Sequence, residues 1–227
     1  MSILKHFNWE HQIIFNDGSI TNLFIENPIT FREYAGELLS QINGEEGNFI
    51  LSLNNEEISI PKNIAIIPDP LNLQFDEKKI NAKINKDLLF LIAKNAEIQK
   101  NSFPLLSMLE QYANTLKDSY GYNINYEIPD DSTLIKLLSF HIDVEFEEQT
   151  DKILEWMNIT HDILKIENFI ILNMQTYFST SEIETICAEA SSSKHNLLLI
   201  NQFNTYNKSN SILIDNDNCE LFKSPIS

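Results

Sequence analysis

A group of lysines in one short segment has the residue type and spacing that could bind phosphate groups. Between Lys78 and Lys100 the chain carries six lysines and only two acidic residues, whereas the whole chain has a formal net charge of -17. Ammonium groups on one surface can neutralise the phosphates of a nucleic acid. The lysines predicted to make such contacts are Lys78, Lys79, Lys83, Lys86 and Lys94.

The spacing of these lysines predicts a helix with two different faces. At about 100° per residue, Lys79, Lys83 and Lys86 lie roughly 120° away from an apolar stripe that begins at Ile80. Two interpretations are open: a solvated face balanced by acids elsewhere, or a surface that follows phosphates. The second would not read bases, because Arg32 is the only arginine. One weakly basic helix binds DNA poorly, but several copies around one axis would add their phosphate contacts.

A second candidate group is acidic and falls where a loop should meet a helix. Glu127, Asp130 and Asp131 follow one another closely there. Carboxylates in irregular backbone suit a hard cation such as Ca²⁺, although this spacing is not that of an EF-hand. The alternative is that Asp130 caps the helix and that these charges favour its N-terminal end. A calcium site and a helix cap are both open at this point.

Several common chemistries are excluded by what the sequence lacks. The chain has five glycines and no Gly-Lys pair, so it cannot form the loop that wraps nucleotide phosphates. The dinucleotide fingerprint is absent too. Cys187 and Cys219 have no zinc spacing with histidine, and Cys187 falls on an apolar helix face as a packed thiol. The five histidines are interpreted as structural or surface residues.

An α/β protein interrupted by helices is the predicted framework for these charges. Residues 167–202 read as strand, helix and strand, with Ser179 and Glu182 as an N-cap signal, and such a crossover is normally parallel and right-handed. The period changes from two to 3.6 at residue 76. We therefore predict an α/β head made of residues 1–75 and 139–227, with an α-helical leg at residues 76–138 inserted into it.

Three further predictions concern the secondary structure of particular segments. Residues 11–26 should form a hairpin around the Asp-Gly turn, followed by a helix from Asn27. A helix break is expected at residues 101–104, which include Pro104. A half-exposed strand is expected over residues 142–146, because apolar and acidic residues alternate there.

Composition bounds the class of protein. With 227 residues, 43% of them hydrophobic, the chain can bury a core, and we expect a soluble globular protein. No run approaches the roughly 18 apolar residues of a membrane span, so no membrane partner is expected. Residues 1–6 lack the apolar centre of a signal peptide, so we expect a cytoplasmic protein.

The order of several segments resembles one family, the small ring-forming CRISPR-associated protein of type II-A systems, which acts in spacer acquisition. The segments that carry the resemblance are Phe15–Ile20 with the helix from Asn27, Thr133–Glu145, Phe178–Ile183 and Ile212–Asp217. They cover most of the chain and occur in the family's order. Each is a loose pattern, so the resemblance depends on their collinearity.

This resemblance implies a head domain with a degenerate P-loop-NTPase-like sheet and an inserted helical leg. It also implies a homotetrameric ring that encloses double-stranded DNA, calcium ions near the junction of head and leg, and no catalytic activity. The implied partners are the CRISPR integrase pair and the RNA-guided nuclease of the same system. Asp130 falls where the family carries acidic residues after a tyrosine, whereas Pro129 departs from that pattern. The DNA-contacting lysines are chosen by periodicity and are not carried over from the family.

Two other functions stay open from the residues alone. A diverged NTPase or nuclease could use the acidic cluster to hold a metal ion. An acidic DNA-mimic inhibitor could use the charge of -17 to occupy the basic groove of another protein.

Overall fold

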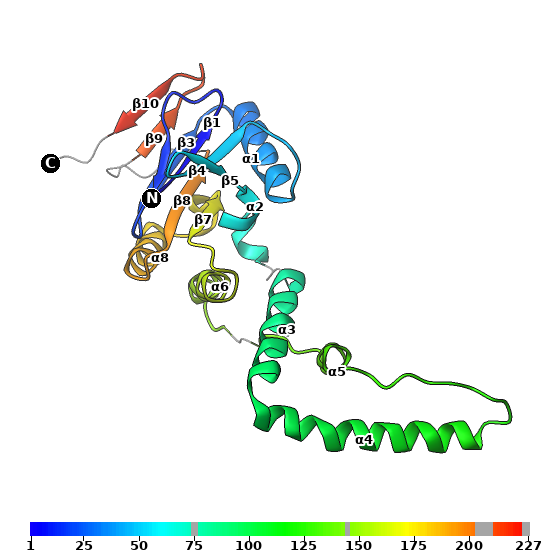
Figure 1. Cartoon of the computed structure of the whole chain (residues 1–227). Helices are drawn as coiled ribbons and strands as arrows, with labels where there is room; N and C mark the ends of the chain where they lie inside the picture. Colours follow the sequence, from blue (N-terminus) through cyan, green and yellow to red (C-terminus); the bar gives the residue numbers. More distant parts are fainter. Residues whose placement is uncertain (74–76, 144–145, 203–210, 224–227) are drawn as a thin grey trace. The chain divides into compact units, whose positions relative to one another are not determined.

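The structure is a computed structural model that describes residues 1–73, 77–143, 146–202 and 211–223 (Figure 1). The chain divides into two compact units, one of residues 1–75 with 145–227 and one of residues 76–144. We call the first the sheet unit and the second the helical unit. None of the helices in the described ranges is long and apolar enough to cross a membrane.

A six-stranded sheet forms the centre of the sheet unit. Its neighbours run parallel from β9 to β6, and β10 is antiparallel to β9 at one edge. The predicted parallel pairing of the two buried strands in residues 167–202 is therefore confirmed, with Ile170 opposite Leu198. In spatial order the strands are β10 (Glu220–Lys223), β9 (Ser211–Ile214), β3 (Ile20–Ile25), β8 (Asn196–Asn201), β7 (Asn168–Leu172) and β6 (Ile64–Ile67).

The central strands send alternate side chains into two separate cores. In β7, Ile170 and Leu172 belong to one core, whereas Phe169 and Ile171 belong to the other. Successive side chains of a strand point to opposite faces, so a strand covered on both faces reads as a continuous apolar run. The mixed α/β class predicted from the sequence is confirmed by this arrangement.

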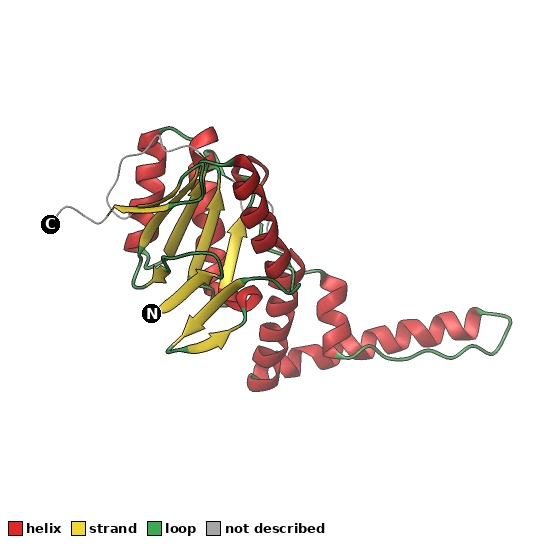
Figure 2. Ribbon diagram, turned by 90° about the horizontal axis from the view of Figure 1, so that it is seen from above, coloured by secondary structure: helices red, strands yellow, loops and turns green. Residues whose placement is uncertain are grey.

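Helices cover both faces of this sheet (Figure 2). Leu38 of α1 (Pro28–Ile42) packs into the first core, and Met157 of α6 (Gln149–Leu164) packs into the second together with Ile183 of α8 (Thr180–Ser192). The predicted cap of α8 is confirmed, since Ser179 and Glu182 form a reciprocal capping box. Short helical segments complete the unit: α2 (Ile60–Asn63), η1 (Pro70–Asn72) and α7 (Met174–Tyr177).

The predicted hairpin of residues 11–26 is wrong, because its two strands enter different sheets. β2 (Ile13–Phe15) pairs with β1 (Ser2–His6) in a four-stranded antiparallel sheet, in the order β2-β1-β4-β5, whereas β3 lies between β8 and β9. The turn itself is present. Gly18 has φ +77°, and a Cβ there would come within 2.5 Å of the Ser191 carbonyl oxygen. The turn therefore carries the chain from one sheet to the other, because β3 is apolar enough to be buried on both faces.

The other two strands of the small sheet form a tight hairpin. β4 (Phe49–Leu53) and β5 (Glu56–Ile58) are joined by Asn54 and Asn55, whose φ values are 52° and 67°. Positive φ at both central residues is the geometry of a type I′ turn, in which asparagine is favoured. β5 is the last strand of its sheet within the described residues.

Three helices make up the helical unit: α3 (Glu77–Lys94), α4 (Ala96–Ser119) and α5 (Asp131–Leu138). The predicted break at residues 101–104 is wrong, since the break falls at Asn95 and Pro104 lies inside α4. The Asn95 side chain accepts hydrogen bonds from the N–H groups of Glu97 and Ile98, which starts a new helix there.

The end of the helical unit also differs from the local prediction. Residues 141–143 and 146 form no strand, and residues 144 and 145 lie outside the described ranges, so the predicted strand over 142–146 is wrong for what is described. The unit extends to residue 144, past the predicted end of the leg at residue 138. Alternation of apolar and acidic residues is therefore not sufficient for a strand where no neighbouring strand is available to pair with it.

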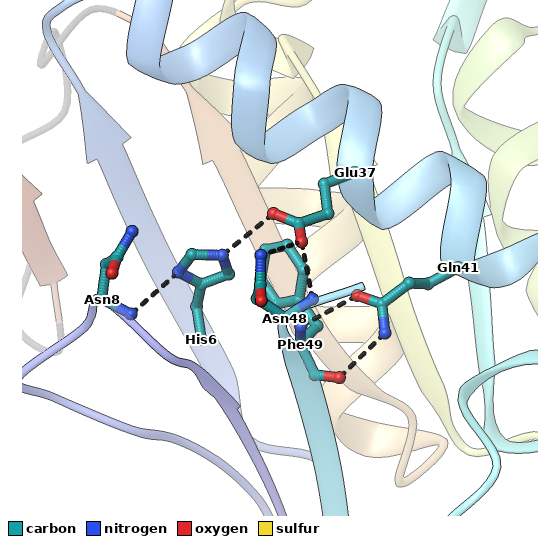
Figure 3. Close-up of polar contacts among 6 residues, drawn as sticks. All are labelled: His6, Asn8, Glu37, Gln41, Asn48 and Phe49. Carbon is teal, nitrogen blue, oxygen red and sulfur yellow. Dashed lines mark hydrogen bonds and ion pairs between the residues drawn. The ribbon is translucent and has the colours of Figure 1, made fainter. Parts of the chain in front are cut away.

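Buried polar side chains join α1 to the small sheet (Figure 3). The His6 ring accepts a hydrogen bond from the Asn8 N–H at Nδ1, so its Nε2 carries the proton and donates to Glu37 at 3.0 Å. The other Glu37 oxygen accepts from the backbone and side-chain N–H groups of Asn48. The structural role predicted for histidine is confirmed for His6, which is buried.

Gln41 supplies a second link between the same elements. Its amide donates to the Phe49 carbonyl oxygen and accepts from the Phe49 N–H, both at 2.9 Å, and the residue is buried (Figure 3). The amide takes the place of a neighbouring strand at the start of β4, where β5 does not reach.

Replacing Gln41 with leucine should lower the free energy of unfolding by about 2 to 4 kcal/mol, because two backbone groups would be buried without a partner. Chemical denaturation of the purified protein measures this loss. Gln12→Leu, at an exposed glutamine of the same unit, is the matched control and should change stability by less than about 0.5 kcal/mol. Equal effects of the two variants would contradict the role given to the Gln41 amide.

Candidate nucleic-acid interface

The basic face of α3 is held outward by packing on its other side. Ile80 is 3% exposed, and Leu134 and Ile135 of α5 are also buried. α3 lies against α5 within the helical unit. The apolar stripe predicted for this helix therefore has a partner at its N-terminal end, although Leu91, near the other end, is half exposed.

The five predicted lysines lie along the length of α3. Lys78, Lys79, Lys86 and Lys94 are exposed, and Lys83 is partly covered. Within the described part of the chain, Lys78 and Lys86 have no ion-pair partner. A surface that presents ammonium groups in this way can meet a row of phosphates without rearranging the helix.

Two of the five lysines have neighbours that alter what they offer. Lys83 forms an ion pair with Asp87 one turn further on, at 2.5 Å. An exposed pair of this kind is worth only a few tenths of a kcal/mol, so a phosphate can replace Asp87 as its partner. Lys94 lies over the ring of Phe90, 4.1 Å from its centroid. Phe90 is exposed, so the basic face also carries an aromatic ring.

Sequence reasoning missed Phe90 as part of this face. The signal was available, because Phe90 follows Lys86 by four residues and precedes Lys94 by four, which places all three on one side of a helix. A division of the helix into apolar and basic positions alone does not bring out this ring.

Within the predicted acidic cluster, Asp130 and Asp131 lie at the N-terminal end of α5, as the helix-cap interpretation expects. Asp130 is the N-cap of α5, and its Oδ1 accepts hydrogen bonds from the N–H and the hydroxyl of Thr133, at 2.8 and 2.6 Å. These bonds hold the pKa of Asp130 below its ordinary value, and the bond from the Thr133 hydroxyl contributes most. Asp131 follows in the first turn of α5, as expected for an acidic residue near a helix N-terminus.

Glu127 lies apart from that cap, in the chain that returns along α4. Residues 126–129 and α4 enclose a small groove of about 200 Å³ that Leu109, Leu116 and Glu127 help to line. The Tyr126 hydroxyl donates to the Asn114 side chain at 2.8 Å and fixes this segment against α4. Glu127 is thus positioned by α4, whereas Asp130 and Asp131 are positioned by α5.

The arrangement of Glu127, Asp130 and Asp131 offers no ready cage for a metal ion. Across the described residues, no three His, Cys, Asp or Glu side chains gather in a way that would hold one. One Asp130 oxygen is also engaged with Thr133. Calcium binding by these residues stays a prediction.

A family model described as CRISPR-associated protein (Cas_Csn2) matches residues 41–218. The match begins at the last turn of α1, includes the whole helical unit and ends in the turn between β9 and β10. It covers well over half of the 227 residues, so the chain belongs to the Cas_Csn2 family of CRISPR-associated proteins. The family resemblance read from the sequence is confirmed. This family is not known as a catalytic one.

Asp130→Ala should release the first turn of α5, because the Thr133 N–H loses its acceptor. Asp130→Asn keeps an acceptor oxygen and is the matched control. Hydrogen exchange should be faster in residues 133–138 of the alanine variant and close to wild type in the asparagine variant. Identical exchange in the two variants would contradict the cap.

Acid should have the same effect as the alanine substitution. Because the folded pKa of Asp130 lies below its ordinary value, the cap contributes stability above that value and loses it as pH falls through the folded pKa. In Asp130→Asn the protection of residues 133–138 should lose this dependence on pH.

Proposed function

We propose that this chain is a non-catalytic protein that binds double-stranded DNA, including its ends, without regard to sequence, and that it acts as a homotetrameric ring in CRISPR spacer acquisition. The observation that carries the proposal is the outward lysine face of α3 in a chain of net charge -17. Family membership supports the CRISPR setting. On this proposal the integrase pair and the RNA-guided nuclease of the same system are its partners.

Charge arithmetic favours several copies acting together. α3 contains five lysines against Glu77 and Asp87, whereas the chain as a whole is strongly acidic. Charges within a Debye length of about 8 Å act on an approaching phosphate. DNA that approaches a single copy would therefore be repelled by the acidic surface around the lysines. Copies whose α3 helices face one axis would combine their phosphate contacts in one binding constant.

The surface of α4 supports association between copies. None of the 24 residues of α4 is buried, although apolar side chains recur along it. Leu105, Tyr112 and Leu116 fall on one side at helical spacing, and each is about half exposed or more. A contiguous apolar face of this kind on a charged chain is typical of an interaction surface.

A degenerate NTPase-like head is part of the proposal, and the junction of β3 with α1 supports it. Parallel α/β sheets bind phosphates where such a strand leads into a helix. Here Asn27 caps α1 directly after Glu26, and its side chain accepts from the N–H groups of Ile29 and Thr30. Pro28 has no N–H to donate. The helix end that would receive a phosphate is thus already satisfied, next to a carboxylate.

The helical unit would be the leg of such a ring, inserted into the head between β6 and α6. Calcium binding at Glu127, Asp130 and Asp131 is a separate proposal, which assembly mass measured with and without Ca²⁺ would test. The proposed ring and its DNA contacts do not require bound calcium.

Changing Lys79, Lys83 and Lys86 together to glutamate should abolish binding of linear duplex DNA in a gel shift. Because each lost phosphate contact reduces the salt slope by about one, the milder change to glutamine should weaken binding and flatten its salt dependence. Lys5, Lys62 and Lys152 changed together to glutamate are a matched control in the sheet unit. Binding that is insensitive to salt, or a lysine variant that binds like wild type, would contradict the proposal. A wild-type protein that binds no duplex DNA would favour the DNA-mimic alternative.

A closed ring should also load at free ends. Linear duplex should therefore bind more tightly than covalently closed circular DNA of the same length. Equal binding of the two forms would contradict a ring.

Changing Leu105, Tyr112 and Leu116 together to glutamine should reduce the mass of the assembly in solution, measured by light scattering. In an isolated chain these exposed positions would tolerate polar residues with little effect. Ser107→Gln with Asp118→Asn, on the opposite side of α4, is the matched control. A wild-type protein that has the mass of one chain, with or without Ca²⁺, would contradict the proposed ring.

A further inference from the structure

An open groove of about 700 Å³ lies in the sheet unit, between the loop that follows α1 and the corner that follows β5. Its floor is apolar and includes Phe49, Leu51 and Ile60, all of them buried. Its rim carries Glu45, Glu46 and Glu57, all of them exposed. We call it the glutamate groove.

The groove exists because β5 is too short to cover β4. β5 pairs with residues 51–53 only, and the chain then turns away at Ser59 into α2, which contains Pro61. Gln41 takes the place of the missing strand at Phe49. Ile50, beside it, stays 46% exposed on the surface of the groove.

Among the described residues no strand pairs with the outer edge of β5, so β5 leaves an unpaired backbone edge beside the groove. In a two-residue hairpin the residues that flank the turn, here Leu53 and Glu56, form a hydrogen-bonded pair. The next pair, Ser52 and Glu57, is then of the other kind, in which the N–H and C=O of Glu57 point away from β4. These two groups can pair with an added strand.

The charge of the groove is entirely of one sign. Among the residues that the structure describes, its lining contains three glutamates and no Lys, Arg or His, and Lys62 lies beyond Pro61 outside the lining. Across the described residues, no three acidic or histidine side chains converge on a single point that would hold a metal ion. Carboxylates spread along a groove suit separate positive charges spaced along a chain better than one cation.

We propose that the glutamate groove binds an extended, lysine- or arginine-rich segment of another protein. The segment adds as a short strand to the edge of β5, with hydrogen bonds to the Glu57 backbone. Its basic side chains meet Glu45, Glu46 and Glu57, and an alternate apolar side chain contacts Ile50. The groove is made of residues of the sheet unit and shares none with the lysine face of α3.

Fluorescence anisotropy with a short labelled peptide, in which lysine alternates with threonine, tests the proposal without DNA. Glu45→Gln, Glu46→Gln and Glu57→Gln together should raise its Kd about tenfold, since three exposed charge pairs are lost. Ser59→Lys, which places an ammonium group in the groove at an exposed position, should raise Kd several-fold. A peptide in which glutamate replaces lysine should not bind.

Two further measurements separate this site from general attraction to an acidic protein. Glu33→Gln, Glu147→Gln and Glu189→Gln together remove the same charge from exposed sites elsewhere and should leave Kd within about twofold. Hydrogen exchange at the Glu57 amide should slow when the peptide binds, because that N–H gains an acceptor.

Equal effects of the two triple variants would overturn the proposal, and so would unchanged exchange at Glu57 or a wild-type protein that does not bind the peptide. A groove variant that lowers the assembly mass while peptide binding persists would assign the groove to a second copy instead. Failure of DNA binding in the α3 lysine variants would leave this result unaffected.

Discussion

Burial of the central strands on both faces is the constraint on which the rest of this protein depends. β3, β7 and β8 are buried on both faces, and most of their side chains are apolar. The chain covers them with α1 and the small sheet on one side and with α6 and α8 on the other. Such strands have no side chains left over for solvent. Charged side chains are therefore found on the outer faces of the helices, in the loops and at the sheet edges, and not on the central strands.

The placement of the α3 lysines outside the sheet unit explains how an acidic chain can present a basic surface. Lysines scattered over the sheet unit would be neutralised by their acidic neighbours, because opposite charges a few ångströms apart screen each other locally. On α3 they lie on one side of a helix whose other side packs against α5, with few acids nearby. On the proposed function, this concentration of positive charge in one unit would direct nucleic acid to α3, because the acidic surfaces elsewhere would repel it.

The errors of sequence reasoning have a common physical cause. The Asp17-Gly18 turn is real, but β2 and β3 part because β3 finds better burial between β8 and β9 than beside β2. Pro104 signals a break, yet the helix divides at Asn95, where a side-chain cap makes a new start favourable. Local sequence signals allow several secondary structures, and contacts with residues distant in the sequence determine which one forms.

The sequence by itself determined the α/β class, the parallel pairing of β7 with β8, the capping box of α8 and the lysine face of α3, since each depends on periodicity or contacts within a few residues. Family membership also followed from the order of its segments. Only the tertiary structure decided which sheet each strand joins, that Gln41 replaces a strand beside Phe49, and that β5 leaves an open edge among three glutamates. These features arise from backbone groups that need partners far away in the chain, and pairing over such separations leaves no periodic signal in the sequence.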